Sequence, residues 1–219
     1  IWIDIDRSTY ALDSIVELLD TDGNILAQSD NYYDEKLGTW QVVTQAGGNV
    51  QAFGLDYSPY LSDDHYTINP RDAGLRVILP GTVGVRGKYF VRVRSSNIDP
   101  TTAASRADLQ DLSKVANGLT SGVYQLQIRL QEEDEFAGTT VQFADIRFAQ
   151  NGIKITGQPV HSPLAGESQE VEPNNNTGAA LPLGNLMDSD RGALAVRGTI
   201  GSDPDVDYYQ FEVNYTHTQ

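Results

Sequence analysis

Two short runs of oxygen-bearing side chains near the end of the chain are the residues best suited to chemistry. Their members are Glu170, Glu172, Asn174, Asn175, Asp203, Asp205 and Asp207. Calcium binds hard oxygens of this kind, supplied by carboxylates, Asn side chains and backbone carbonyls. The two runs are expected to meet if the strand that ends at Ile200-Gly201 returns toward the first run. The alternative is that each run only forms an Asx-type turn.

The sequence shows no catalytic motif. Its histidines, His65, His161 and His217, have no His-x-x-His or His-Glu-x-x-His spacing. No Gly-x-Ser-x-Gly elbow and no phosphate-binding Gly loop occurs. Asp and Glu are plentiful, so paired carboxylates for glycoside hydrolysis remain open on sequence grounds. Without a supporting motif, we expect the chain not to be an enzyme.

Aromatic residues between positions 32 and 66 suggest a binding surface. The candidate ligand-binding residues are Tyr32, Tyr33, Trp40, Tyr57 and Tyr60. Exposed Tyr and Trp rings would suit stacking on a polysaccharide or contact with collagen. The alternative is that these loops pack their aromatic rings over one end of the fold.

Composition restricts the partners that the chain can have. The 219 residues carry a formal net charge of -15, which disfavours nucleic acid and anionic membrane surfaces. Cysteine is absent, so disulfides and thiolate metal sites are excluded. No run of apolar residues is long enough for a transmembrane helix. Ile1-Trp2-Ile3-Asp4 resembles the middle of a strand rather than a signal peptide, which indicates a mature fragment or an excised repeat.

Strand patterns dominate the chain, whereas helical signal is confined to residues 103–115. Alternating or apolar runs predict strands at 1–6, 14–19, 25–27, 75–79, 87–95, 122–130, 193–200 and 208–213. Asp22-Gly23-Asn24 between two of these runs is typical of a hairpin turn. Many short strands with turns between them predict an all-β protein, an antiparallel β-sandwich of jelly-roll-like type with a short irregular or helical insertion.

Several segments, taken in cyclic order, resemble the bacterial pre-peptidase C-terminal domain. The opening of that domain resembles 170-EVEPNNNTGAALPL-183, 194-LAVRGTIG-201 and 205-DVDYYQFEV-213, and its later part resembles 12-LDSIVELLDTDGNILAQSDN-31 and 79-LPGTVGVRGKYFVRVRS-95. The resemblance covers about half of the chain and implies a β-sandwich. Similar collagen-binding domains bind calcium at the corresponding linker, which implies Glu172, Asn174 and Asp205 or Asp207 as ligands here.

This order places the first half of the motif after the second half. We therefore expect a sandwich with an extension at 1–165, a linker at 166–176 and the opening strands of a next or completing sandwich at 177–219. The final strand, which contains Tyr208, Tyr209, Phe211 and Val213, needs an edge to pair with. It closes either on its own chain or on a neighbouring copy, and the polar linker favours the second.

The function expected from these patterns is structural. The chain resembles a non-catalytic repeat of a secreted or cell-surface bacterial protein, stabilised by calcium and joined head to tail to copies of itself or to adjacent repeats. The alternative is an accessory module that holds a secreted peptidase or other hydrolase on extracellular collagen or polysaccharide.

Overall fold

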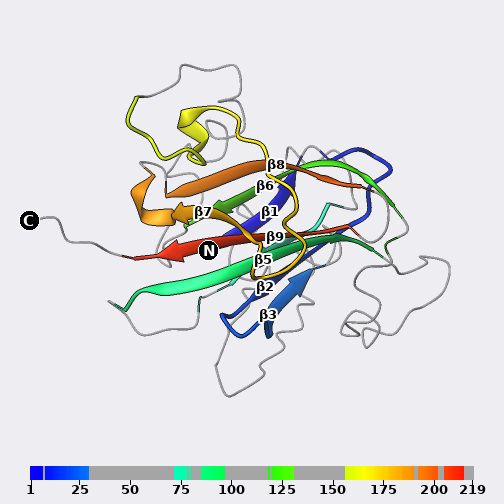
Figure 1. Ribbon diagram of the computed structural model, residues 1–219, viewed down its shortest axis with the longest axis horizontal. Helices are drawn as coiled ribbons and strands as arrows, with labels where there is room; N and C mark the ends of the chain where they lie inside the picture. The colour runs from blue at the N-terminus through cyan, green and yellow to red at the C-terminus, as the bar shows by residue number, and fades with distance from the viewer. Residues whose placement is uncertain are drawn as a thin grey trace, which may run out of the picture.

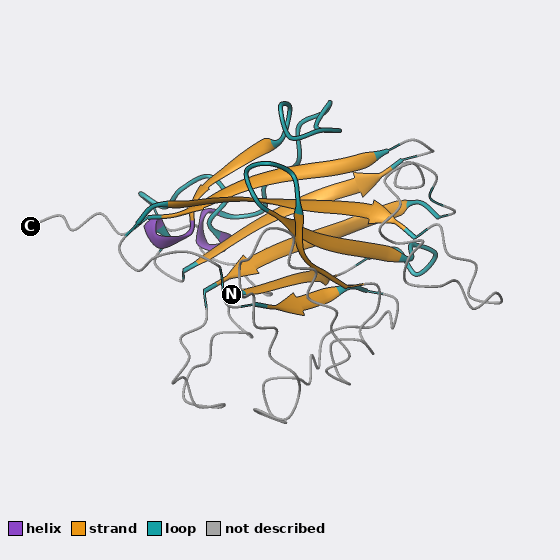
Figure 2. Ribbon diagram, turned by 90° about the horizontal axis from the view of Figure 1, so that it is seen from below, coloured by secondary structure: helices purple, strands orange, loops and turns teal. Residues whose placement is uncertain are grey.

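The computed structural model describes residues 1–6, 8–29, 72–77, 79, 85–96, 118, 120–130, 156–189, 192–201 and 205–214. Within them, two sheets pack face to face as a β-sandwich (Figures 1 and 2). The predicted fold class is therefore confirmed. No helix in this part of the chain has both the length and the hydropathy to span a bilayer.

The first sheet has four strands in the order β4-β1-β6-β8, and all of its pairs are antiparallel. Its strands are β1 (Trp2–Asp6), β4 (Gly74–Arg76), β6 (Gly122–Arg129) and β8 (Ala193–Ile200). Alternation assigns the two faces of β1, because Ile3 and Ile5 lie in the core while Asp4 contacts Arg129 on the opposite face.

The second sheet has five strands in the order β3-β2-β5-β9-β7. Its strands are β2 (Ser14–Leu19), β3 (Ile25–Ser29), β5 (Gly87–Ser95), β7 (Leu181–Asn185) and β9 (Val206–Val213). The pairing of β7 with β9 is parallel, so this sheet is mixed rather than wholly antiparallel. Two short 3-10 turns, Pro163–Ala165 and Leu186–Asp188, flank the later strands.

The final strand is paired on both sides within its own chain. β9 runs antiparallel to β5 and parallel to β7, so it lies inside the second sheet (Figure 1). Tyr209 and Phe211 point into the core, and the ring of Phe211 stacks on Tyr89 with centroids 5.6 Å apart. The Tyr208 hydroxyl accepts a hydrogen bond from Arg92 on the other face, and Val213 is partly buried against the core.

Candidate metal site

The polar run after residue 166 lies along the outer edge of β8. Gln169 forms a parallel bridge with Arg197, and the Arg197 N–H donates to the Ser168 carbonyl at 2.9 Å. The Glu170 N–H donates to the Arg197 carbonyl at 2.9 Å, and Glu170 Oε1 accepts from the Thr199 N–H at 2.6 Å. These backbone bonds cover the edge of β8 and fix the Glu170 carboxylate beside it.

The same run then crosses to the start of β9. The Asn174 carbonyl accepts from the Tyr208 N–H at 3.0 Å, and its N–H donates to Glu172 Oε2 at 2.9 Å. This crossing brings Glu170 and Glu172 to Asp207, the inward-facing residue at the start of β9. One carboxylate oxygen from each of the three lies within 4.8 Å of the others. We call Glu170, Glu172, Asn174 and Asp207 the acidic cluster.

Asn174 is fully buried, and one atom of its amide faces only the cluster. That atom lies 3.2 Å from Glu172 Oε2 and 3.1 Å from Asp207 Oδ1. The other atom of the amide faces only hydrogen-bond donors, so hydrogen bonding on both sides favours Nδ2 as the atom that faces the cluster, where it donates to both carboxylates. With Oδ1 in that place, a fourth oxygen would converge with the three carboxylates, an arrangement that requires a cation among them. Asn174 thus adds a buried polar group aimed into the cluster.

Two tyrosine hydroxyls close the cluster on the side of the core. Tyr209 Oη donates to Glu170 Oε2 at 2.7 Å, Tyr124 Oη donates to Asp207 Oδ2, and the two hydroxyl oxygens lie 2.7 Å apart. Tyr124 comes from β6 in the first sheet, and Tyr209 comes from β9 in the second. The network therefore joins the two sheets at one end of the core.

Gly198 makes room for this pair of hydroxyls. A Cβ atom at position 198 would lie 2.5 Å from Tyr124 Oη and 2.6 Å from Tyr209 Oη, closer than side-chain carbons approach other atoms. Gly198 is the register partner of Tyr124 in the β6–β8 pair. A side chain at this position of β8 would displace the hydroxyls from the carboxylates.

The carboxyl groups of the cluster are buried beside one another, and both burial and mutual repulsion disfavour their charged forms. Burial, reinforced by the charge of Glu170, raises the pKa of Asp207 to about 9. Burial also raises the pKa of Glu170, although hydrogen bonds from Tyr209 and the Thr199 N–H oppose the shift. None of the ion pairs formed among the described residues involves the cluster. A bound cation would supply the positive charge that these carboxylates lack.

The structure brings together four of the seven residues predicted for the metal site. Asn175, by contrast, is exposed beside the cluster. Asp205 accepts a hydrogen bond from the Gly201 N–H at 2.5 Å, which links the residue before β9 to the residue after β8. Asp203 lies outside the described residues, as do the aromatic residues Tyr32, Tyr33, Trp40, Tyr57 and Tyr60.

Sequence reasoning missed Tyr124, Tyr209 and Gly198 as parts of the site. Tyr209 was predicted only as part of a strand that needs a partner. Gly198 carried a signal, because a glycine inside the otherwise regular strand 193–200 indicates a close approach by another group. Tyr124 lies 83 positions before Asp207 in sequence, so no local pattern could have connected them.

No family model, no curated protein and no solved structure matches this chain. The candidate ligand atoms of the acidic cluster are carboxylate and amide oxygens, and tyrosine hydroxyls lie behind them. The chain has no cysteine that could supply a thiolate. Such a donor set suits a hard divalent cation.

Proposed function

We propose that this chain is a non-catalytic β-sandwich module that binds calcium at the acidic cluster. The observation that carries the proposal is the convergence of three carboxylates, with one oxygen from each within 4.8 Å of the others, at the fully buried Asp207. Acidic residues often gather on surfaces without binding an ion. The burial of Asp207 is the feature that favours a ligand here, because a buried carboxylate is costly without a compensating charge.

Calcium fits this donor set better than other divalent cations. Zinc favours His and Cys ligands, and magnesium requires a small octahedral site that keeps several waters. Calcium accepts six to eight oxygens in flexible geometry, so waters and backbone carbonyls can complete the shell around the four side chains. The Glu172 side chain is exposed, which leaves the cluster accessible from solvent.

The cation would have a structural role. Glu170 and Glu172 belong to the run that covers the edge of β8, whereas Asp207 belongs to β9 in the other sheet. A cation shared by these residues ties the run to both sheets. Its binding free energy then adds to the stability of the fold, by about 2.7 kcal/mol at a hundredfold excess over Kd.

We further propose that the module belongs to a secreted or cell-surface bacterial protein and joins copies of itself or adjacent repeats head to tail. Extracellular modules commonly bind calcium only weakly, with Kd values on the order of 10⁻⁴–10⁻³ M, which suits a site with a solvent-accessible ligand. The accessory-module alternative depends on aromatic residues outside the described part of the chain. Its test is binding of the purified chain to collagen and to insoluble polysaccharide.

The test of calcium binding is a titration by calorimetry and by thermal unfolding, with calcium added to chelator-treated protein. The diagnostic variant is Glu172→Gln, because this exposed side chain can change without disturbing the core. Its matched control is Glu167→Gln, an acid on the same run that contacts Arg197 at 3.3 Å instead of the cluster. We expect the stabilisation by calcium to weaken in Glu172→Gln and to persist in Glu167→Gln. Equal responses of the wild type and both variants would reject the site.

A further inference from the structure

Each sheet is built from two portions of the chain, an earlier one and a later one. Strands β1 to β6 form the earlier portion, and β7, β8 and β9 form the later one. In the first sheet the boundary falls between β6 and β8, and in the second between β5 and β9, each an antiparallel pair over the whole strand. We call the described residues up to 130 the N-terminal portion and those from 156 to 214 the C-terminal unit.

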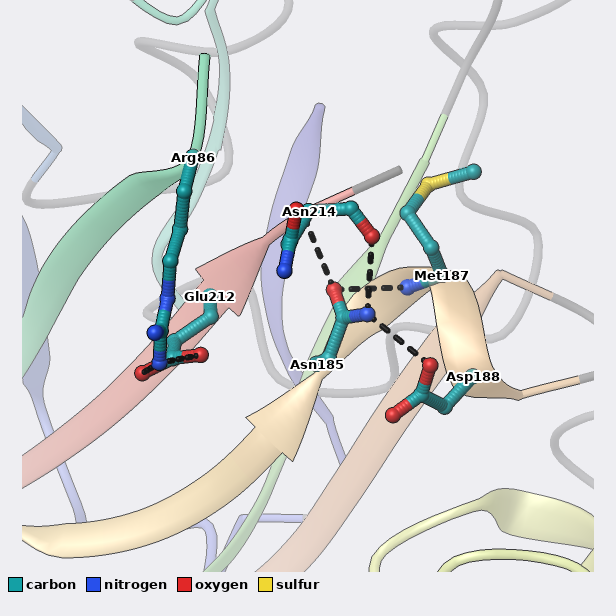
Figure 3. A network of polar contacts seen from close by, with 6 residues as sticks. All are labelled: Arg86, Asn185, Met187, Asp188, Glu212 and Asn214. Carbon is teal, nitrogen blue, oxygen red and sulfur yellow. Dashed lines mark hydrogen bonds and ion pairs between the residues drawn. The ribbon is translucent and has the colours of Figure 1, made fainter. Parts of the chain in front are cut away.

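The C-terminal unit is held together by its own contacts. All four members of the acidic cluster lie within it, and Ser162 hydrogen-bonds Ser189 at 3.0 Å. The side chain of Asn185, at the end of β7, hydrogen-bonds the backbone of Asn214 twice (Figure 3). Asn185 Nδ2 donates to the Asn214 carbonyl at 2.9 Å, and Asn185 Oδ1 accepts from the Asn214 N–H at 3.0 Å. β9 therefore cannot leave without breaking the cluster and the β7 pairing, so the unit is the smallest piece that can move intact.

Contacts across the boundary do not depend on the two portions sharing one chain. They are the two strand pairs, the core between the sheets, and side-chain contacts such as Tyr124 with Asp207. Another such contact joins Arg86 to Glu212 (Figure 3). A second copy of the chain offers the same surface in the same register. Exchange thus preserves every one of these interactions, which is the condition for swapping an element between identical subunits.

Simple strand addition at the β7 edge of the second sheet is a poorer route to assembly. The edge strand there is β7, which contains Pro182 and Gly184. Pro182 has no N–H to donate, and Gly184 has a φ of 101°, outside the extended range of a strand. Both features blunt an edge against pairing with another chain.

We propose that the C-terminal unit as a whole exchanges between copies, so that the β7–β9 side of one chain completes the β1–β6 side of another. This rests on the head-to-tail assembly proposed above and names its moving part and its partner, a second copy of this chain. Reciprocal exchange gives a closed dimer, and one-way exchange gives an open array. Because the cluster travels with the unit, calcium stabilises both arrangements and does not by itself choose between them.

Protein concentration sets the balance between the two arrangements. Closure on the same chain is intramolecular and independent of protein concentration, whereas exchange requires two copies to meet. Closure on the same chain therefore dominates in dilute solution, and exchange increases when copies are crowded.

The experiment uses engineered cysteines, since the natural chain has none. Lys88 on β5 and Glu212 on β9 are register partners across the boundary. Opposite Cα atoms in antiparallel strands lie about 4.5–5.5 Å apart, within the span of a disulfide. Full-length Lys88→Cys and Glu212→Cys proteins are unfolded together in urea, refolded at increasing total concentration with calcium, and oxidised. Glu212→Cys mixed with Asp22→Cys, at an exposed turn, measures collisional cross-linking.

Exchange predicts a disulfide between position 88 of one copy and position 212 of another, several-fold above the Asp22→Cys mixture and increasing with concentration. The double variant Lys88→Cys/Glu212→Cys, refolded at low concentration, is the positive control. An intramolecular disulfide in this protein shows that β5 and β9 of the same chain have paired in the observed register. If that disulfide forms while the mixture cross-links only at the control level, the proposal is wrong. Calcium titration and light scattering on the same samples separate this failure from loss of calcium binding and from assembly through another surface.

Discussion

At the scale of single residues, the orientation of one buried amide distinguishes a cation site from a self-contained polar cluster. Asn174 either donates two hydrogen bonds to Glu172 and Asp207 or offers them a further oxygen. The change Asn174→Asp separates these two cases. It removes both possible donors and adds a fourth carboxylate, so protein in chelator should lose stability through charge repulsion in a buried site.

Calcium should reverse that loss if the cluster is a cation site. We expect the difference in Tm between calcium and chelator to be larger for Asn174→Asp than for the wild type, measured by thermal unfolding at fixed pH. The matched control is Asn185→Asp, which also replaces an amide that donates two hydrogen bonds but lies away from the cluster. Its calcium response should equal that of the wild type. A smaller calcium response in Asn174→Asp would favour the self-contained cluster.

Gly198 is the second residue for which a single atom decides the outcome. In Gly198→Ala, the new Cβ atom meets the hydroxyl oxygens of Tyr124 and Tyr209. Overpacking of this kind costs about 1–3 kcal/mol, and the displaced hydroxyls should also weaken calcium binding. Urea unfolding measures the first effect and calorimetric titration the second. Gly178→Ala is the control, because its nearest neighbour is the end of the Asn176 side chain at 3.2 Å; unchanged stability in both variants would contradict the packing argument.

The sequence indicated the polar residues that meet in the cluster but not the groups that support them. Glu170, Glu172, Asn174 and Asp207 were predictable because carboxylates and amides in short runs are typical of candidate cation sites. Asp205 belongs to the same run as Asp207, yet it points to the Gly201 N–H instead. Alternation would place two residues that are two positions apart on the same face, so the difference arises because β9 begins at Val206 and leaves Asp205 outside the strand. The pattern predicted a start two residues later.

At the scale of elements, a buried ion cluster joins β2 to β5. Glu17 lies opposite Arg92 in the register, and its carboxylate contacts both Arg92 and Arg94. Burial raises the pKa of Glu17, but the two guanidinium groups outweigh it, so the pKa falls below its usual value of 4.5. A depressed carboxyl pKa stabilises the fold above about pH 4.5, and this contribution is lost as the pH falls through the folded-state pKa.

The change Glu17→Gln tests this cluster. Removing one partner of a buried ion pair costs about 3–5 kcal/mol, because the remaining charges stay buried without compensation. The difference in the free energy of unfolding between wild type and variant should be largest at pH 7 and should decrease as the pH falls below about 4.5. Urea unfolding between pH 7 and pH 3 measures it. The control, Glu212→Gln, breaks the exposed pair with Arg86 and should cost at most about 1 kcal/mol of unfolding free energy. If the loss of stability in Glu17→Gln does not change with pH, the lowered pKa of Glu17 is refuted.

Strands with strong local patterns were predictable, and those defined by distant partners were not. β5 was predicted with its observed bounds, because an aromatic pair is followed by apolar and polar residues that alternate from Val91 to Arg94. β7 was missed, since Leu-Pro-Leu-Gly-Asn contains a proline and a glycine and has no strand-like alternation. Its parallel partner β9 supplies the pairing, and the bulge between Pro182 and Gly184 accommodates the irregular residues.

At the scale of the whole molecule, neither portion of the sandwich has a complete core. The N-terminal portion supplies one side of each sheet and the C-terminal unit supplies the other. Each portion alone would expose an unpaired strand edge and an apolar face. The cyclic order of the motifs predicts a different division, at 1–165, 166–176 and 177–219, and this stays a prediction. The sequence could not indicate the partner of the last strand, because pairing within a chain and between copies buries the same residues.

The last prediction follows from this shared core: the two portions should unfold together in a single transition. Leu126 on β6 and Phe211 on β9 lie in different portions, and both belong to the core cluster. Leu126→Ala and Phe211→Ala should each shift the same calorimetric transition to lower temperature. The free energy of unfolding should fall by about 2–5 kcal/mol for Leu126→Ala and by about 3–5 kcal/mol for Phe211→Ala. The ratio of calorimetric to van't Hoff enthalpy should stay near unity in both variants. Hydrogen exchange provides the second readout, because amides of β5 and β6 should lose protection when either residue is changed. Two separate transitions, or loss of protection confined to β9 in Phe211→Ala, would mean that the C-terminal unit opens independently of β1 to β6.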